Sequence, residues 1–117
     1  MDFELSEEQK QLQKMLREFA EEEIKPVATE YDVEEKYPHE VMDKAAENGL
    51  LGAGIPLEYG GAGYDTLDTS IMVEEMFAAD PGIGFCLTAS AFGSEAIVEY
   101  GTEEQKEEYL PKLVDGG

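Results

Sequence analysis

The fold is decided by the helix signals in Gly101-Thr-Glu-Glu-Gln-Lys-Glu-Glu-Tyr-Leu-Pro-Lys-Leu-Val-Asp-Gly-Gly117. Thr102 and Gln105 have the spacing of a capping box, in which two side chains satisfy free backbone N–H groups at a helix start. Gly101 can end a preceding helix, because glycine adopts the left-handed conformation without a Cβ penalty. Pro111 is expected to interrupt or restart the new helix, since proline lacks a backbone N–H. The segment therefore predicts consecutive helices in this part of the chain.

A similar pattern opens the first predicted helix, where Ser6 and Gln9 form a second capping box. Apolar residues then recur at helical spacing, at Leu12, Met15, Leu16, Phe19 and Ala20. Further helical segments are expected over about 27–31, 38–48, 66–79 and 83–100, and the last would be about 27 Å long. No clear strand pattern occurs. The sequence thus predicts one domain over residues 1–117, an all-α bundle of about five to six helices.

A glycine-rich loop is expected between residues 50 and 64. Its two short motifs, Gly52-Ala-Gly54 and Gly61-Ala-Gly63, each match the first two glycines of a dinucleotide-binding fingerprint. No third glycine follows three positions later, and no strand precedes either motif, so the dinucleotide interpretation fails on context. Tight turns with positive φ are the better interpretation.

The formal net charge of −20 is the strongest compositional signal. It argues against nucleic-acid binding, which needs Lys and Arg to neutralise phosphates, and against a nucleotide site made by this chain alone. No apolar run reaches the ~20 residues of a membrane helix, and the N-terminus shows no basic leader. We therefore expect a cytoplasmic protein with no membrane or nucleic-acid partner, and a mature mitochondrial protein is the alternative.

Side chains that could carry chemistry are few. Cys86 and His39 are the only cysteine and histidine of the chain, so no zinc site is expected. We interpret Cys86 as a small buried hydrophobe and His39 as a solvated residue in the first turn of a helix. Glu74 and Glu75 interrupt an apolar helix, but no histidine stands near them, as a di-iron bundle would require. No metal ligand and no catalytic residue is assigned.

The segment 83–94 differs from the rest, because it carries no charged residue. Its small residues leave space on the helix surface, while Phe85, Leu87 and Phe92 supply apolar walls and Thr88 adds one hydroxyl. Three interpretations stay open. The segment can be a central core helix with close helix–helix packing, the wall of an apolar ligand slot, or a contact face for another domain.

Several signatures, in this order, resemble the N-terminal helical domain of the acyl-CoA dehydrogenase family. They are Phe3-Glu-Leu-Ser-Glu-Glu-Gln9, Arg17-Glu-Phe-Ala20, Ile24-Lys-Pro26, Gly49-Leu-Leu-Gly52, Ile55-Pro-Leu-Glu-Tyr-Gly-Gly-Ala-Gly63, Gly101-Thr-Glu-Glu-Gln-Lys106 and Tyr109-Leu-Pro111. Together they cover the whole chain. Family members are several times longer and continue into a β-rich middle domain and a second helical domain. The resemblance therefore implies that both of these domains are absent from this chain.

The resemblance implies an oxidoreductase that converts an acyl-CoA thioester to the trans-2-enoyl-CoA, in fatty-acid β-oxidation or amino-acid catabolism. In the family, a glutamate base removes the α-proton while the β-hydride moves to FAD, and the flavin then reduces an electron-transfer flavoprotein. The base and most flavin contacts belong to later domains. Neither a catalytic residue nor bound FAD is therefore expected on this chain alone, and a homo-oligomer is the expected assembly.

The resemblance also assigns part of the acyl-chain wall to the helix that matches 83–94. Carried over by position, the candidate lining residues are Phe85, Thr88, Ala89 and Phe92. The two bulky phenylalanines suggest a bounded slot and a short or medium acyl chain. Two rivals stay open: an acyl-CoA oxidase with the same domain plan and, from another class, a free-standing acidic helical interaction module.

Overall fold

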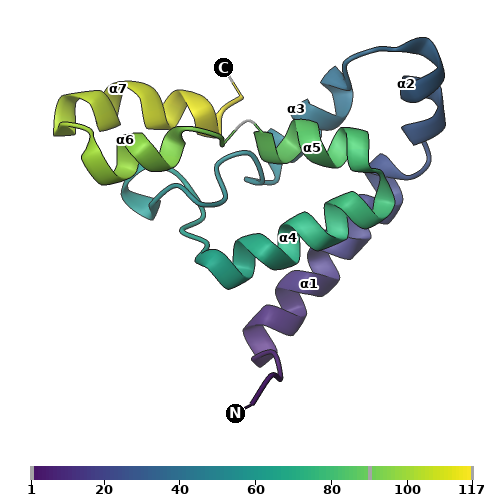
Figure 1. The fold of residues 1–117 in the computed structure, drawn as a ribbon, viewed down its shortest axis with the longest axis horizontal. Helices are drawn as coiled ribbons and strands as arrows, with labels where there is room; N and C mark the ends of the chain where they lie inside the picture. Colours follow the sequence, from purple (N-terminus) through teal and green to yellow (C-terminus); the bar gives the residue numbers. More distant parts are fainter. Residues whose placement is uncertain (1, 90, 117) are drawn as a thin grey trace.

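The computed structural model describes residues 2–89 and 91–116 and shows an all-α domain, as the sequence predicts (Figure 1). The α-helices are α1 (Glu7–Phe19), α2 (Ala28–Glu34), α3 (His39–Glu47), α4 (Thr66–Ala79), α5 (Pro81–Ala89), α6 (Ser94–Tyr100) and α7 (Glu103–Val114). A π-helical segment, Ala20–Ile24, extends α1, and a 3₁₀ turn, Leu57–Tyr59, lies in the glycine-rich loop. No strand occurs within the described residues.

Capping boxes fix the starts of three helices. In each box the first side chain accepts a bond from the backbone N–H three residues on, and that residue's side chain accepts from the backbone N–H of the first. The pairs are Ser6 with Gln9 for α1, Asp65 with Asp68 for α4, and Thr102 with Gln105 for α7. The boxes predicted for α1 and α7 are therefore confirmed.

The expected single helix over 83–100 is wrong, because the chain divides there into α5 and α6. Pro81 opens α5, and its preceding residue Asp80 accepts a bond from the N–H of Ile83 at 2.8 Å. Beyond Ala89 the bonds are those of turns, and Gly93 has a φ of 89°, a conformation that ends regular helix. The span 81–100 is long and apolar enough to cross a bilayer by length and hydropathy alone. Core helices of globular proteins meet the same criterion.

The expected interruption at Pro111 is also wrong. Helix α7 continues through Pro111 to Val114. The preceding Leu110 is fully buried, so its packing holds this turn in place while the proline forgoes one backbone bond.

The core forms where α4 packs between α1 and α5. Leu16 on α1, Met76 on α4 and Leu87 on α5 are each no more than 1% exposed. Gly84 lets α5 approach α4 closely, since a Cβ at this position would lie 3.0 Å from the carbonyl carbon of Met76. The buried side of α5 is thus a close-packed core helix.

An ion pair joins α1 to α4 beside this core. The Glu75 side chain is only 8% exposed, and Arg17 donates two hydrogen bonds to it, Nε to Oε2 at 3.0 Å and Nη2 to Oε1 at 2.8 Å. This bonding and the carboxylate charge raise the pKa of Arg17. The arrangement explains why a glutamate can sit inside an apolar helix, because a buried carboxylate needs a charged partner.

The glycine-rich loop folds back on itself. The N–H of Tyr64 donates to the carbonyl of Ala53 at 2.8 Å, and that of Gly63 to Ile55 at 3.0 Å. At Gly61 a Cβ would lie 1.9 Å from the carbonyl oxygen of Ile55, so only glycine fits. Tight turns are present as expected, but of the four motif glycines only Gly63 has a positive φ, 66°, so the expected positive φ is wrong for Gly52, Gly54 and Gly61.

Helix α7 holds this loop against the domain. The hydroxyl of Tyr59 donates to the Glu103 carboxylate at 2.9 Å. This bond raises the pKa of Tyr59 to about 12, and it lowers the pKa of Glu103, which Lys106 also favours in its charged form. At the other end of α7, Val114 packs so close to Gly52 that a Cβ there would lie 2.5 Å from its Cγ2.

The domain is flat, with principal extents of 42 × 41 × 20 Å. The α6–α7 pair and α2 lie at opposite ends in Figure 1, and α4 and α5 lie between them. Its accessible surface of 7609 Å² exceeds the roughly 6,300 Å² expected for a compact monomer of this mass. The fold therefore leaves more surface uncovered than a compact monomer of its size.

A matched pair of glycine substitutions tests the loop. Gly61→Ala should destabilise the domain by about 2 kcal/mol or more, because the new methyl collides with backbone. Gly54→Ala is the control: no atom lies within 4 Å of its would-be Cβ, so it should be neutral or stabilising by up to about 1 kcal/mol. Urea unfolding followed by circular dichroism measures both. Equal stability of the two variants would contradict this account of the loop.

Candidate functional site

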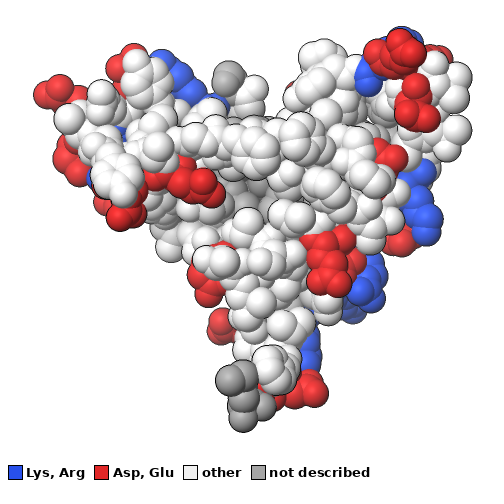
Figure 2. Space-filling view, in the orientation of Figure 1, with Lys and Arg blue, Asp and Glu red and all other residues white. Residues whose placement is uncertain are grey.

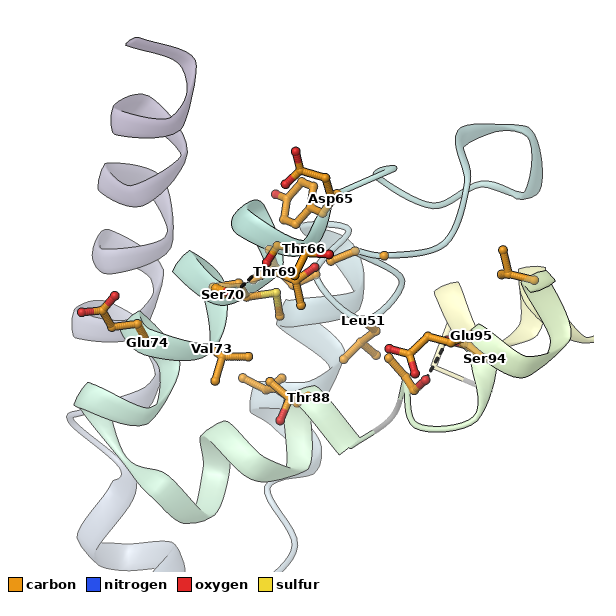
Figure 3. A pocket seen from close by; sticks show the side chains of 18 of the residues that line it. Leu51, Asp65, Thr66, Thr69, Ser70, Val73, Glu74, Thr88, Ser94 and Glu95 are labelled. Carbon is orange, nitrogen blue, oxygen red and sulfur yellow. Dashed lines mark hydrogen bonds between the residues drawn. The ribbon is translucent and has the colours of Figure 1, made fainter. Parts of the chain in front are cut away.

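A cavity of about 720 Å³ opens between α4, α5, α6 and the start of the glycine-rich loop (Figure 3). Its floor is apolar and buried, formed by Leu51, Met72 and Leu87. Val73 on α4 and Val98 on α6 continue this surface toward the opening. A cavity of this size with an apolar floor suits a small or chain-like apolar group.

Hydroxyl groups lie around this floor, and three of them already donate their protons to backbone carbonyls. Thr88 donates to the carbonyl of Gly84 at 3.0 Å, and Ser70 and Ser94 donate to carbonyls of their own segments at 2.7 Å each. Their oxygen atoms therefore remain as acceptors for a ligand, not as free donors.

Carboxylates stand at the edge of the cavity. Asp65 caps the start of α4, Glu74 lies on α4, and Glu95 and Glu99 lie on α6; all four residues are exposed. No Lys, Arg or His is found among the described residues that line the cavity. These residues do not fit FAD, because its pyrophosphate needs cationic or N–H donors and would meet negative charge here.

The four predicted lining residues lie in different surroundings. Thr88 is on the cavity, whereas Phe85, Ala89 and Phe92 are not among the residues that line it. Phe85 and Phe92 are 53% and 69% exposed and pack edge to face, with ring centroids 5.8 Å apart. Their assignment to an acyl-chain wall stays a prediction.

The described residues of segment 83–94 lie in three different surroundings. Ile83, Gly84 and Leu87 are buried in the core. Thr88 faces the cavity, and Phe85 and Phe92 form an exposed aromatic pair. Ser90 lies outside the described residues. One segment thus serves the core on one side and presents apolar surface on another.

The cavity residues on α4 were missed by the sequence analysis. Thr66, Thr69, Ser70 and Val73 line the cavity from this helix. Thr69, Ser70 and Val73 follow Thr66 by three, four and seven residues, which places all four on one helix face. This spacing could have predicted them from the sequence.

Uncharged side chains form a band over α5 (Figure 2). In Figure 2, which has the orientation of Figure 1, the charged side chains gather toward the edges while uncharged side chains cover the band over α5. Contiguous uncharged surface with exposed aromatic residues is typical of a contact or binding face.

Of the two single-copy reactive residues, His39 is placed as expected, whereas Cys86 is only partly buried. Cys86 is partly buried against the core, and burial raises the pKa of its thiol, so it stays protonated at neutral pH. His39 is the exposed first residue of α3, with its ring 4.7 Å from that of Tyr37. In the described part of the chain, no group of three or more His, Cys, Asp and Glu side chains could hold a metal ion.

Comparison with known families matches residues 6–117 to the domain described as "Acyl-CoA dehydrogenase, N-terminal domain". The chain belongs to the acyl-CoA dehydrogenase family. The resemblance carried by the sequence signatures and the expected fold class are therefore confirmed.

Relatives and solved structures agree with this family. The chain is 47% identical to the acryloyl-CoA reductase (NADH) of Anaerotignum propionicum over 100% of its length, and 44% identical to the short-chain specific acyl-CoA dehydrogenase of Clostridium acetobutylicum over 99%. It spans 30% and 31% of these two relatives. The butyryl-CoA dehydrogenase structure from Megasphaera elsdenii, 35% identical, matches 99% of the chain with a TM-score of 0.86, over 31% of its own length.

The exposed aromatic pair should promote self-association of the 117-residue chain. We expect its weight-average sedimentation coefficient to rise with concentration, because copies can bury Phe85 and Phe92 against each other. The sedimentation coefficient of the double variant F85S/F92S should rise less with concentration. Tyr100→Ser on α6 is the control, since Tyr100 is 85% exposed but lies outside the pair. A strictly monomeric wild-type chain at high concentration would count against this prediction.

Proposed function

We propose that the chain is the N-terminal helical domain of an FAD-dependent acyl-CoA dehydrogenase, and that α5 supplies part of the wall around the acyl chain. The observation that carries the proposal is the family match over residues 6–117, together with the uncharged α5 face. The whole enzyme would oxidise an acyl-CoA thioester between Cα and Cβ to the trans-2-enoyl-CoA. This oxidation would serve fatty-acid β-oxidation or amino-acid catabolism.

The part played by this chain is to bind and enclose the acyl group. Apolar side chains of α5 and the cavity floor would contact the hydrocarbon and exclude water from it. Thr88 lies between Phe85 and Phe92 in sequence and also on the cavity, so it would join the aromatic pair to the cavity. We assign no catalytic residue to this chain.

The flavin and the electron acceptor belong to the rest of the proposed enzyme. The cavity residues do not fit FAD, so a middle domain and a C-terminal domain beyond these residues would hold it. Supporting this, an acyl-CoA dehydrogenase of Bacillus anthracis, 35% identical, was solved with FAD. A chain 39% identical comes from work on the electron transferring flavoprotein of Acidaminococcus fermentans, which supports a partner of that kind.

Two related activities remain candidates, each favoured by a relative's name. A solved prolyl acyl carrier protein oxidase matches with a TM-score of 0.85 at 32% identity, so the same domain occurs in an oxidase. The relative at 47% identity is named a reductase, which favours the reverse direction across the same bond. Membership of the family argues against a free-standing acidic interaction module.

We further propose a cytoplasmic homo-oligomer. The named bacterial relatives support the cytoplasm, whereas the mitochondrial isobutyryl-CoA dehydrogenase of Dictyostelium discoideum, 41% identical, supports the mature mitochondrial alternative. Excess surface on this flat domain supports burial against other parts of an assembly.

Flavin content separates the domain from the proposed enzyme. The purified 117-residue chain should be colourless and give no calorimetric signal with butyryl-CoA, because its cavity lacks cations for FAD or CoA phosphates. The full-length protein should be yellow, and acyl-CoA should bleach its flavin absorbance under anaerobic conditions. Flavin that co-purifies with the 117-residue chain would contradict the proposed division, and a colourless full-length protein would contradict the function.

A further inference from the structure

The half of the chain that surrounds the cavity carries negative charge alone. Residues 45–105 include eleven Asp and Glu and not one Lys or Arg. This span contains the glycine-rich loop, α4, α5 and α6, and therefore every element that lines the cavity. The charge pattern is thus a property of the site and not of the chain's average composition.

The cations of the chain are already occupied elsewhere. All eight Lys and Arg side chains form ion pairs, and their partners are glutamates that do not line the cavity. The one pair that reaches α4 is Arg17 with Glu75, which lies beside the core and not among the lining residues. No cation of the described chain is thus free to neutralise the edge of the cavity.

The cavity itself combines two properties. Its floor of Leu51, Met72 and Leu87 can accept hydrocarbon. Its edge carries four carboxylates: Asp65, which caps α4, Glu74 on α4, and Glu95 and Glu99 on α6. An anion that entered would lose water without gaining a cation, and it would face like charge.

We propose that this domain selects acyl-CoA thioesters whose far end is uncharged and rejects those that end in a second carboxylate. The inference rests on the proposed function and names the substrate class of the same site. The acyl chain would pass Thr88 and reach the apolar floor, where a terminal methyl is tolerated and a terminal carboxylate is repelled.

Paired substrates of equal carbon number test this proposal on the full-length enzyme. Valeryl-CoA is compared with glutaryl-CoA, and hexanoyl-CoA with adipoyl-CoA, with kcat/KM measured by reduction of a dye acceptor. The neutral member of each pair should be preferred on the order of 100-fold, because like charges that face each other strongly disfavour binding. Equal or better use of the dicarboxylic members overturns the proposal and leaves the dehydrogenase function standing. Failure to turn over any of the four thioesters overturns the proposed function instead.

A double variant then tests whether the cavity carboxylates cause the preference. Glu95→Gln with Glu99→Gln removes two charges from exposed positions on α6, so the fold should persist, which the thermal midpoint checks. The ratio of valeryl-CoA to glutaryl-CoA kcat/KM should fall several-fold. Glu104→Gln on α7 is the matched control, because Glu104 is an exposed acid outside the cavity, and it should keep the wild-type ratio. An unchanged ratio in the folded double variant overturns the proposal.

Discussion

The close contact between α4 and α5 sets the geometry of the face that carries the cavity and the aromatic pair. Gly84 has no side chain, and the backbone of α4 occupies the space that a Cβ would need, 3.0 Å from the carbonyl carbon of Met76. Once this side of α5 is committed to the core, the helix turn exposes Phe85, while Thr88, four residues after Gly84, lies half-buried where the core meets the cavity. The aromatic pair and the cavity wall are therefore consequences of how tightly two helices pack.

The Arg17–Glu75 pair holds the other side of α4. A carboxylate inside an apolar helix is costly unless a cation meets it, and the two hydrogen bonds from Arg17 supply that partner. The pair links α1 to α4 beside the fully buried Leu16 and Met76. Because α1 fixes α4 and α4 fixes α5, this interaction helps to position the cavity without touching it.

Local signals in the sequence predicted the helices, whereas contacts between residues far apart in the sequence could not be predicted. Capping boxes and apolar spacing depend on neighbours within four residues, so the starts of α1 and α7 could be read directly. The break after Ala89 could not, because an uncharged run with helical composition hides a turn that Gly93 completes. Glu75 looked unexplained for the same reason: its partner stands 58 residues earlier. Of the predicted wall, only Thr88 lies on the cavity, since lining depends on how α4, α5 and α6 meet.

We propose that the exposed surface formed by Phe85 on α5 and Phe92 in the turn after it is a wall that other parts of the enzyme complete. Alkylation of a thiol introduced by Phe92→Cys, in a Cys86→Ser background, measures this most directly. Its rate is compared between the 117-residue chain and the full-length protein, with peptide mapping to isolate the site. Alkylation should be fast in the domain, where Phe92 is 69% exposed, and much slower in the full-length protein. Equal rates in the two proteins would contradict it.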